Sequence, residues 1–179
     1  MSETIPIVVD LDGTLVRDDT LYVLTWQMLL KKPWTCLLLP IKLLGGKAAM
    51  KQYMSSVLAL DPSPLSFHQE LIAWLKQQQL SGRPIVMCTA SSQQVADTIA
   101  EHLGFFDEVI GSGSEVNLSG TRKAALLVKR YGQKKFDYCG NAEVDLSVWK
   151  EANAAIVVNA KDGLAKQAAT LCEVSKIFD

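Results

Sequence analysis

Residues 5–14 read Ile-Pro-Ile-Val-Val-Asp-Leu-Asp-Gly-Thr, a short apolar run that ends in two aspartates. A continuous apolar run rich in β-branched residues is typical of a strand buried on both faces of a parallel sheet. Asp10 and Asp12 stand at positions i and i+2 after this run, so they emerge at the same end of the sheet, and Gly13 lets the chain turn sharply. The stretch predicts a central strand that delivers two carboxylates to one site.

Similar apolar runs recur downstream and alternate with helical patterns. The predicted strands are Ile85–Cys88, Glu108–Ile110, Phe136–Cys139 and Ala154–Val158. The helical patterns, with apolar residues three or four apart, cover roughly 66–80, 92–103, 121–131, 142–152 and 162–172. This alternation predicts an α/β fold with a doubly wound parallel sheet. Ligands of such sheets collect at the carboxyl ends of the strands, which here are followed by Asp10–Gly13, Thr89–Ser91 and Gly140–Asn141.

The first two strands are separated by far more chain than one crossover helix needs. We therefore expect a core domain of residues 1–16 and 79–179, with residues 17–78 forming a small helical cap inserted after the first strand. Leu21–Leu30 is apolar at eight of ten positions and Trp34–Ile41 is nearly as apolar. Neither piece approaches the ~20 apolar residues of a membrane span. The cap could pack its apolar faces over the site, rest on anionic lipid or a membrane-embedded partner, or do both.

Charge is balanced overall but segregated along the chain. The 18 basic and 19 acidic side chains give a net charge of −1, which argues against nucleic acid as a partner. Thr20–Leu60 nevertheless holds five lysines and no acid, so the remaining residues carry 13 minus 19, or −6. The lysines Lys31, Lys32, Lys42, Lys47 and Lys51 thus make the cap the basic part of the chain.

The four cysteines are scattered without metal-binding spacing, which indicates reduced thiols that serve in packing. The polar Met1–Thr4 and the short apolar run after it do not have the form of a signal peptide. We therefore expect a cytoplasmic protein, either free or at the cytoplasmic face of the membrane.

Two paired carboxylates suit phosphoryl transfer. A carboxylate such as Asp10 can attack phosphorus and hold it as an acyl phosphate, which splits one hard displacement into two easier ones. Asp12 can protonate the leaving oxygen and later deprotonate the attacking water, a role worth about 10²- to 10⁴-fold in rate. The alternative, an Asp-Gly turn beside a helix cap, explains one aspartate but not two.

The Asp10–Thr14 motif resembles the first motif of the haloacid dehalogenase superfamily, DxDGT. The resemblance implies a phosphatase in which Thr89, after the next core strand, holds a phosphoryl oxygen and Lys123, at the start of a later helix, neutralises charge on Asp10. Arg122 and Lys129 are rivals of Lys123. The dehalogenase branch lacks the second aspartate, so Asp12 favours phosphate release. By position, Leu11, Gly13, Ala90 and Ser91 are expected to contact the substrate.

The fourth motif of this superfamily reads GD with a second acid three or four residues later, whereas here Asn141 replaces the first acid. The resemblance implies Mg²⁺ as cofactor, held by Asp10, the Asp12 backbone carbonyl, Asn141 and Asp145. An amide oxygen can bind this hard cation but brings less charge than a carboxylate. Glu143 is an alternative that lies off the pattern. The departure concerns metal affinity more than the fold.

A narrower resemblance covers nearly the whole chain. The phrases Val8–Leu15, Lys31–Trp34, Leu37–Pro40, Ala59–Pro62 and Gly140–Trp149 are similar to the phosphatase-like domain fused ahead of UbiA-type membrane prenyltransferases, and the phrases from the cap are more distinctive than the catalytic ones. This resemblance implies a prenyl-linked phosphate or phosphosugar as substrate and a membrane surface or prenyltransferase domain as partner. The alternative is a catalytically weak docking or regulatory domain. His68 and His102 lie in helical stretches and are assigned no role.

Overall fold

The computed structural model describes residues 4–113 and 116–179, so Met1 to Glu3, on which the expectation of no signal peptide partly rests, lie outside the described residues. A six-stranded sheet forms the centre, with the order β3-β2-β1-β4-β5-β6 and parallel pairing throughout. The predicted α/β fold with a parallel sheet is confirmed. The strands are β1 Ile7–Val9, β2 Ile85–Ser92, β3 Glu108–Ser112, β4 Asp137–Gly140, β5 Ala154–Val158 and β6 Glu173–Phe178.

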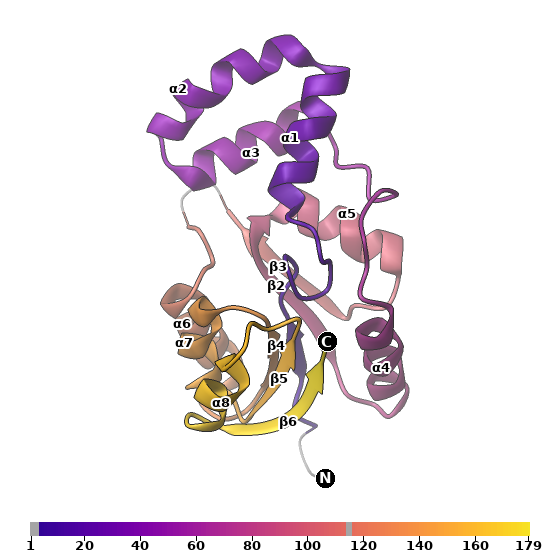
Figure 1. Ribbon diagram of the computed structural model, residues 1–179, viewed down its shortest axis with the longest axis vertical. Helices are drawn as coiled ribbons and strands as arrows, with labels where there is room; N and C mark the ends of the chain where they lie inside the picture. The colour runs from indigo at the N-terminus through magenta and orange to yellow at the C-terminus, as the bar shows by residue number, and fades with distance from the viewer. Residues whose placement is uncertain (1–3, 114–115) are drawn as a thin grey trace.

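Helices cover both faces of the sheet (Figure 1). On one side lie α4 Gln69–Leu80 and α5 Gln93–Leu103, and on the other α6 Thr121–Tyr131, α7 Leu146–Trp149 and α8 Leu164–Ala169. The strand β1 is apolar at every position because it serves two cores. Ile7 and Val9 pack into the cluster with α4 and α5, whereas Val8 packs into the cluster with α6 and α7. The opening apolar run thus fixes β1 in the middle of the molecule.

The structure differs from the sequence predictions in three places. The second strand continues to Ser92 instead of ending at Cys88. The helix predicted over 142–152 is a 3-10 turn, η2 Glu143–Asp145, followed by the short α7, because Asp145 folds back onto the backbone N–H groups of Asn141 and Ala142. The strand β6 was not predicted, since most of its side chains are exposed at the edge of the sheet.

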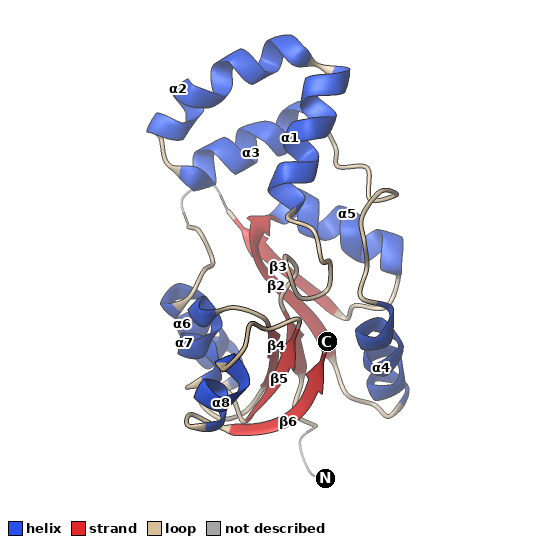
Figure 2. Ribbon diagram, viewed as in Figure 1, coloured by secondary structure: helices blue, strands red, loops and turns tan. Residues whose placement is uncertain are grey.

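The insertion after β1 forms a helical layer beyond the carboxyl ends of the strands (Figure 2). It contains α1 Thr20–Lys31, the 3-10 helix η1 Pro33–Leu38, α2 Leu39–Leu44 and α3 Lys47–Val57. Leu24, Met28 and Met54 anchor it in the same cluster as Ile7 and Val9. The domain boundaries at residues 17 and 78 stay a prediction, but α4 lies beside the sheet, whereas α1 to α3 lie beyond it. None of the described helices combines the length and apolarity that crossing a bilayer requires.

Candidate active site

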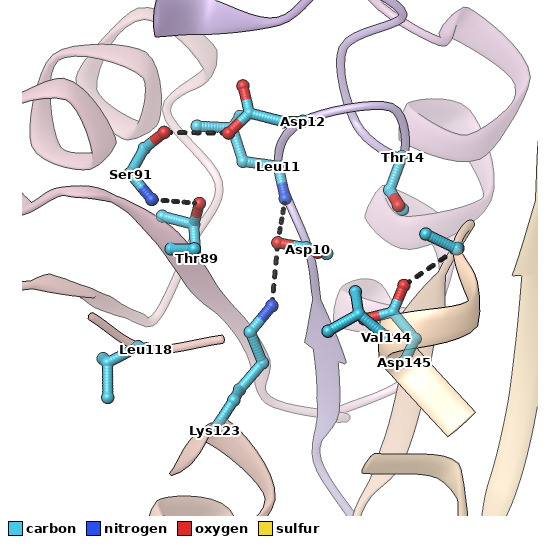
Figure 3. A network of polar contacts seen from close by, with 12 residues as sticks. Asp10, Leu11, Asp12, Thr14, Thr89, Ser91, Leu118, Lys123, Val144 and Asp145 are labelled. Atoms are coloured by element: carbon cyan, nitrogen blue, oxygen red, sulfur yellow. Dashed lines mark hydrogen bonds and ion pairs between the residues drawn. The ribbon is translucent and has the colours of Figure 1, made fainter. Parts of the chain in front are cut away.

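Asp10 is the first residue after β1 and is held from two directions (Figure 3). Its Oδ1 atom accepts a hydrogen bond of 2.8 Å from the backbone N–H of Leu11 and lies 2.9 Å from Nζ of Lys123. The Lys123 side chain is only 2% exposed. Both contacts fall on Oδ1, and the described residues give Oδ2 no hydrogen bond. One Asp10 oxygen is therefore fixed while the other remains available.

Burial and charge set the ionisation of this pair. Burial raises the pKa of Asp10, the positive charge of Lys123 opposes that rise, and the negative charge of Asp145 adds to it. For Lys123, burial alone would lower the pKa, but the charges of Asp10 and Asp145 outweigh it and the pKa is raised. Lys123 therefore stays protonated beside Asp10, inside a site with more carboxylates than cations.

Asp12 is held by the cap and by the end of β2. Its Oδ1 accepts a hydrogen bond of 2.7 Å from the backbone N–H of Thr20, and its Oδ2 accepts one of 2.8 Å from the hydroxyl of Ser91. The Thr20 and Ser91 hydroxyls lie 2.9 Å apart and share a further hydrogen bond. Burial raises the pKa of Asp12, with Thr20 and Ser91 opposing it. A carboxyl with a raised pKa suits a group that must alternately give and take a proton.

Tyr138 connects the residues of two predicted motifs. Nζ of Lys123 donates a hydrogen bond of 2.7 Å to the Tyr138 hydroxyl, which in turn donates one of 3.0 Å to Oδ1 of Asp145. All three side chains are buried. Sequence reasoning gave Tyr138 no role. The available signal was a tyrosine in a fully buried strand, because its hydroxyl must find a polar partner there.

Thr89 is completely buried inside β2 and does not follow the strand as predicted. Its Oγ1 accepts 3.0 Å from the backbone N–H of Ser91, so its own hydroxyl hydrogen remains to be donated. Of the three candidate cations of α6, Lys123 contacts Asp10, whereas Arg122, in the first turn, and Lys129, in the last turn, are exposed. The geometry thus brings Asp10, Asp12, Thr89 and Lys123 to one end of the sheet (Figure 3).

The other predicted contact residues contribute mainly through the backbone. The Leu11 side chain is buried in the core, so only its backbone can face a ligand. Gly13 has a φ of +77°, and a Cβ there would come within 2.1 Å of Nδ2 of Asn141. The Ala90 carbonyl accepts hydrogen bonds from Lys51 and Ser112. Glycine at position 13 therefore suits the positive φ, and a methyl group there would displace the Asn141 amide.

The predicted metal ligands form an oxygen-rich corner beside Asp10. Asn141 Oδ1 accepts 3.3 Å from the Thr14 hydroxyl and keeps a second lone pair. Asp145 is largely engaged, since Oδ2 accepts from the N–H groups of Asn141 and Ala142 and Oδ1 from Tyr138. In the part of the chain that the structure describes, no cluster of three His, Cys, Asp or Glu side chains suits a metal ion. Glu143 is exposed.

A cation nonetheless fits the chemistry of this corner. Its donors are oxygens, as Mg²⁺ prefers, and the charge of Asp145 works against ionisation of Asp10. A divalent cation would relieve that repulsion. It would depend on the Asp10 carboxylate together with neutral oxygens from Asn141 and the Asp12 backbone, which is a less charged set than two aspartates and a third acid would give.

Sequence reasoning missed the contacts between the cap and the end of β2. Besides the Thr20–Ser91 bond, Nζ of Lys51 donates 2.8 Å to the Ala90 carbonyl, and the Ser55 and Ser92 hydroxyls lie 2.5 Å apart. Three consecutive residues of β2 therefore each bind one cap side chain. No sequence pattern indicated these pairs, because they join segments separated by 37 to 71 residues.

Comparisons with known proteins agree with this architecture. A family model described as haloacid dehalogenase-like hydrolase matches residues 7–134. The chain is 30% identical over 154 residues to the uncharacterized protein y4nM of Sinorhizobium fredii, a match that covers 86% of this chain and 30% of the relative. The chain thus spans about 30% of the length of that curated relative.

Two solved structures resemble the fold over most of both chains. A protein with unknown function from Bordetella pertussis gives a TM-score of 0.71 at 14% identity, covering 97% of each chain. Phosphoserine phosphatase in its apo form gives a TM-score of 0.64 at 14% identity, covering 98% of this chain and 94% of that one. At such identities the likeness concerns the fold alone.

Proposed function

Since this chain belongs to the haloacid dehalogenase-like hydrolase family, we propose that it is a phosphatase that hydrolyses phosphate monoesters with Asp10 as nucleophile. The observation that carries the proposal is the buried contact of 2.9 Å between Asp10 and Lys123, with Asp12 directed to the same end of the sheet. A structural ion pair would explain Lys123 beside Asp10, because a buried carboxylate needs a cation. It would not explain a second, partly buried carboxyl, Asp12, at the same end of the sheet with no ion pair to a described residue.

In the proposed reaction, Oδ2 of Asp10 attacks phosphorus and the bond from phosphorus to the leaving alcohol oxygen breaks. Asp12 gives its proton to that oxygen, so the alcohol leaves neutral. Asp12, now ionised, takes a proton from a water molecule that attacks the acyl phosphate. The bond between phosphorus and Asp10 then breaks, which releases inorganic phosphate and restores both carboxyl groups to their starting states.

The remaining residues position the phosphoryl group. The free hydroxyl hydrogen of Thr89 and the ammonium group of Lys123 would bind phosphoryl oxygens, where negative charge must be stabilised. Gly13, Ala90 and Ser91, with the backbone of Leu11, would line the space around the ester. These roles follow from position at the carboxyl ends of β1 and β2.

We include Mg²⁺ in the proposal. Asp10, the Asp12 backbone carbonyl and Asn141 would hold it. Asp145, predicted from the sequence as a direct ligand, would instead orient Asn141 through the backbone N–H, because both of its oxygens accept hydrogen bonds. When bound, it would supply positive charge against the phosphoryl oxygens. The neutral Asn141 leads us to expect weaker binding than an aspartate at that position would give.

For the substrate we propose a phosphate ester that carries an apolar group, a prenyl-linked phosphate or a sugar phosphate attached to one. The support is the cap, whose exposed apolar side chains lie beyond the site. Turnover of polyprenyl phosphates should then exceed that of water-soluble esters. Equal or faster turnover of small soluble esters would exclude the lipid substrate.

A second candidate function is a catalytically weak domain that docks on a membrane prenyltransferase. The observation that favours it is the fourth motif, where Asn141 is neutral and both oxygens of Asp145 are engaged by hydrogen bonds. A decayed metal site would leave the fold intact and lose turnover. Such a domain would be inert toward all phosphate esters.

Hydrolysis of an aryl phosphate, with and without Mg²⁺, distinguishes the two candidates. The phosphatase requires wild-type turnover that is lost in Asp10→Asn and kept in Glu173→Gln, which alters an exposed acid at the start of β6, the opposite end of the sheet. If wild type and Asp10→Asn are equally inert over aryl, sugar and prenyl phosphates, the docking function holds and the enzyme is excluded.

A further inference from the structure

The helix α1 is apolar on two opposite faces. One stripe is buried and comprises Thr20, Leu24, Gln27 and Met28. A second stripe, displaced by two residues and therefore by about 200° around the helix, is exposed and comprises Tyr22, Trp26, Leu29 and Leu30. A helix on the surface of a water-soluble domain normally carries polar residues on its outer face. The outer face of α1 is instead suited to an apolar environment.

The next segment continues this pattern. Pro33–Leu44, which spans η1 and α2, contains no buried residue. Its exposed large apolar residues are Trp34, Leu37, Leu38, Ile41, Leu43 and Leu44. Together with the outer stripe of α1 they form what we call the apolar cap surface. It holds ten of the fourteen exposed large apolar side chains among the described residues, the other four being scattered over the core.

Such a concentration requires a partner, because isolated soluble domains rarely expose contiguous apolar patches of this kind. The patch lies over α1, η1 and α2, and Figure 1 places η1 and α2 at the opposite end of the molecule from β6. It is therefore free of the fold's own packing and faces outward beyond the candidate active site.

The charges around the patch identify the partner. Lys31, Lys32, Lys42 and Lys47 are exposed on the same elements or at their ends. None of these lysines forms a salt bridge with a described residue, and Thr20–Leu60 contains no acid. A second copy would bring like charges together. Anionic headgroups would instead neutralise the lysines, while tryptophan, tyrosine and leucine enter the interfacial layer.

We propose that the apolar cap surface binds the surface of an anionic phospholipid membrane. The helices are too short to cross a bilayer, α1 having 12 residues and α2 six, so they would lie in the interface with the lysines at headgroup level. This inference concerns binding alone and does not rest on the proposed phosphatase activity.

Sedimentation with vesicles tests the proposal. Wild-type protein should bind vesicles of phosphatidylcholine containing about 30% phosphatidylglycerol and bind pure phosphatidylcholine much more weakly. The double variant Trp34→Ser with Leu44→Ser should lower the partition coefficient by about tenfold for each side chain removed. The control Leu80→Ser with Ile177→Ser removes two exposed apolar side chains from the core and should bind as wild type does.

A second pair of variants tests the charge. Lys31→Gln with Lys47→Gln should weaken binding to the anionic vesicles about 25-fold, since each lysine near such a surface contributes a factor of about five. Lys129→Gln with Lys166→Gln, which alters two exposed lysines of the core domain, should leave binding to the anionic vesicles unchanged. All altered side chains are exposed, so folding should be retained, and circular dichroism checks this.

Three results would overturn the proposal. The first is no binding of wild type to anionic vesicles, and the second is equal binding to neutral and anionic vesicles. The third is self-association in light scattering that the Trp34 and Leu44 substitutions abolish while vesicle binding is absent, which would assign the surface to a second copy.

Discussion

Nζ of Lys123 lies 2.7 Å from the hydroxyl oxygen of Tyr138 and contacts Asp10 as well, so the lysine donates hydrogen bonds to both side chains. The same hydroxyl donates to Asp145, which in turn holds the N–H of Asn141. One buried chain of contacts therefore runs from the candidate nucleophile to the candidate metal-binding loop. Its middle member, Tyr138, has no place in the motifs read from the sequence.

The Tyr138→Phe variant should lose both stability and activity. Without the hydroxyl, Lys123 and Asp145 each lose a buried hydrogen-bond partner, which should lower the free energy of unfolding by about 1–3 kcal/mol in urea titrations. Turnover should fall, but less than in Asp10→Asn. Tyr131→Phe is the matched control, because that hydroxyl donates to Glu108, away from the site. Unchanged turnover in Tyr138→Phe would show that the chain of contacts is merely structural.

Asp12→Asn should separate activity from stability. Loss of the acid and base should lower turnover by about 10²- to 10⁴-fold. The asparagine can still accept from Thr20 and can donate to Ser91, so the contacts persist. A variant that loses stability as well as activity would contradict this expectation.

The difference in stability between Asp12→Asn and wild type should depend on pH in a defined direction. Burial raises the pKa of Asp12 above its ordinary value of 3.8. The folded state therefore holds this proton more tightly than the unfolded state, and wild type loses stability as pH rises from about 4 through the raised pKa. The variant lacks that loss, so its advantage in free energy of unfolding should grow as pH rises from about 4 through the raised pKa. Urea titrations with a chelator present measure it.

Gly13→Ala should be far more damaging than its conformation alone explains. Gly13 has a φ of +77° and a Cβ would meet Asn141 at 2.1 Å, whereas Gly82 has a φ of +83° and nothing within 4 Å. Gly82→Ala should cost about 1–2 kcal/mol, the strain of the left-handed conformation. Gly13→Ala should cost more and abolish turnover. Equal losses of stability in the two variants would show that the loop relaxes around the new methyl group.

Asn141→Asp should strengthen Mg²⁺ binding. The added carboxylate increases the charge of the donor set, so Mg²⁺ should raise the melting temperature of the variant more than that of wild type. Without Mg²⁺ the variant should be the less stable of the two, because the new carboxylate would repel those of Asp10 and Asp145. Glu143→Gln, at an exposed acid off the pattern, is the control. A smaller Mg²⁺ shift in Asn141→Asp than in wild type would place the cation elsewhere.

Local patterns predicted most of the core. The run Ile7–Val9 is apolar at every position because both of its faces are buried, and strands of that kind are the easiest to recognise. The edge strand β6 was not predicted, because four of its six side chains are exposed and only Phe178 is buried. The helix expected over 142–152 failed because Asp145 satisfies backbone N–H groups locally, which competes with helix formation.

The site divides in the same way. Asp10, Asp12 and Lys123 occupy positions relative to strands and helices that a sequence can show. Lys51 and Ser55 act through contacts between distant segments, and a single sequence has no signal for such pairs. Tyr138 had a weaker signal, a tyrosine within a buried strand, which does not identify its partners. The sequence also left open whether the outer face of α1 is exposed, because an apolar helix has the same sequence pattern whether or not another element covers its second face.

The backbone N–H of Thr20, the first residue of α1, donates a hydrogen bond to Oδ1 of Asp12. The exposed Tyr22, Trp26 and Leu30 lie further along the same helix. A helix tilts as one body. A contact that displaces these three side chains would therefore also move the Thr20 N–H relative to the carboxyl group of Asp12. A tilt of α1 would therefore break the hydrogen bond between the Thr20 N–H and Asp12, the candidate acid, so a contact at the outer face of the cap could alter the candidate active site.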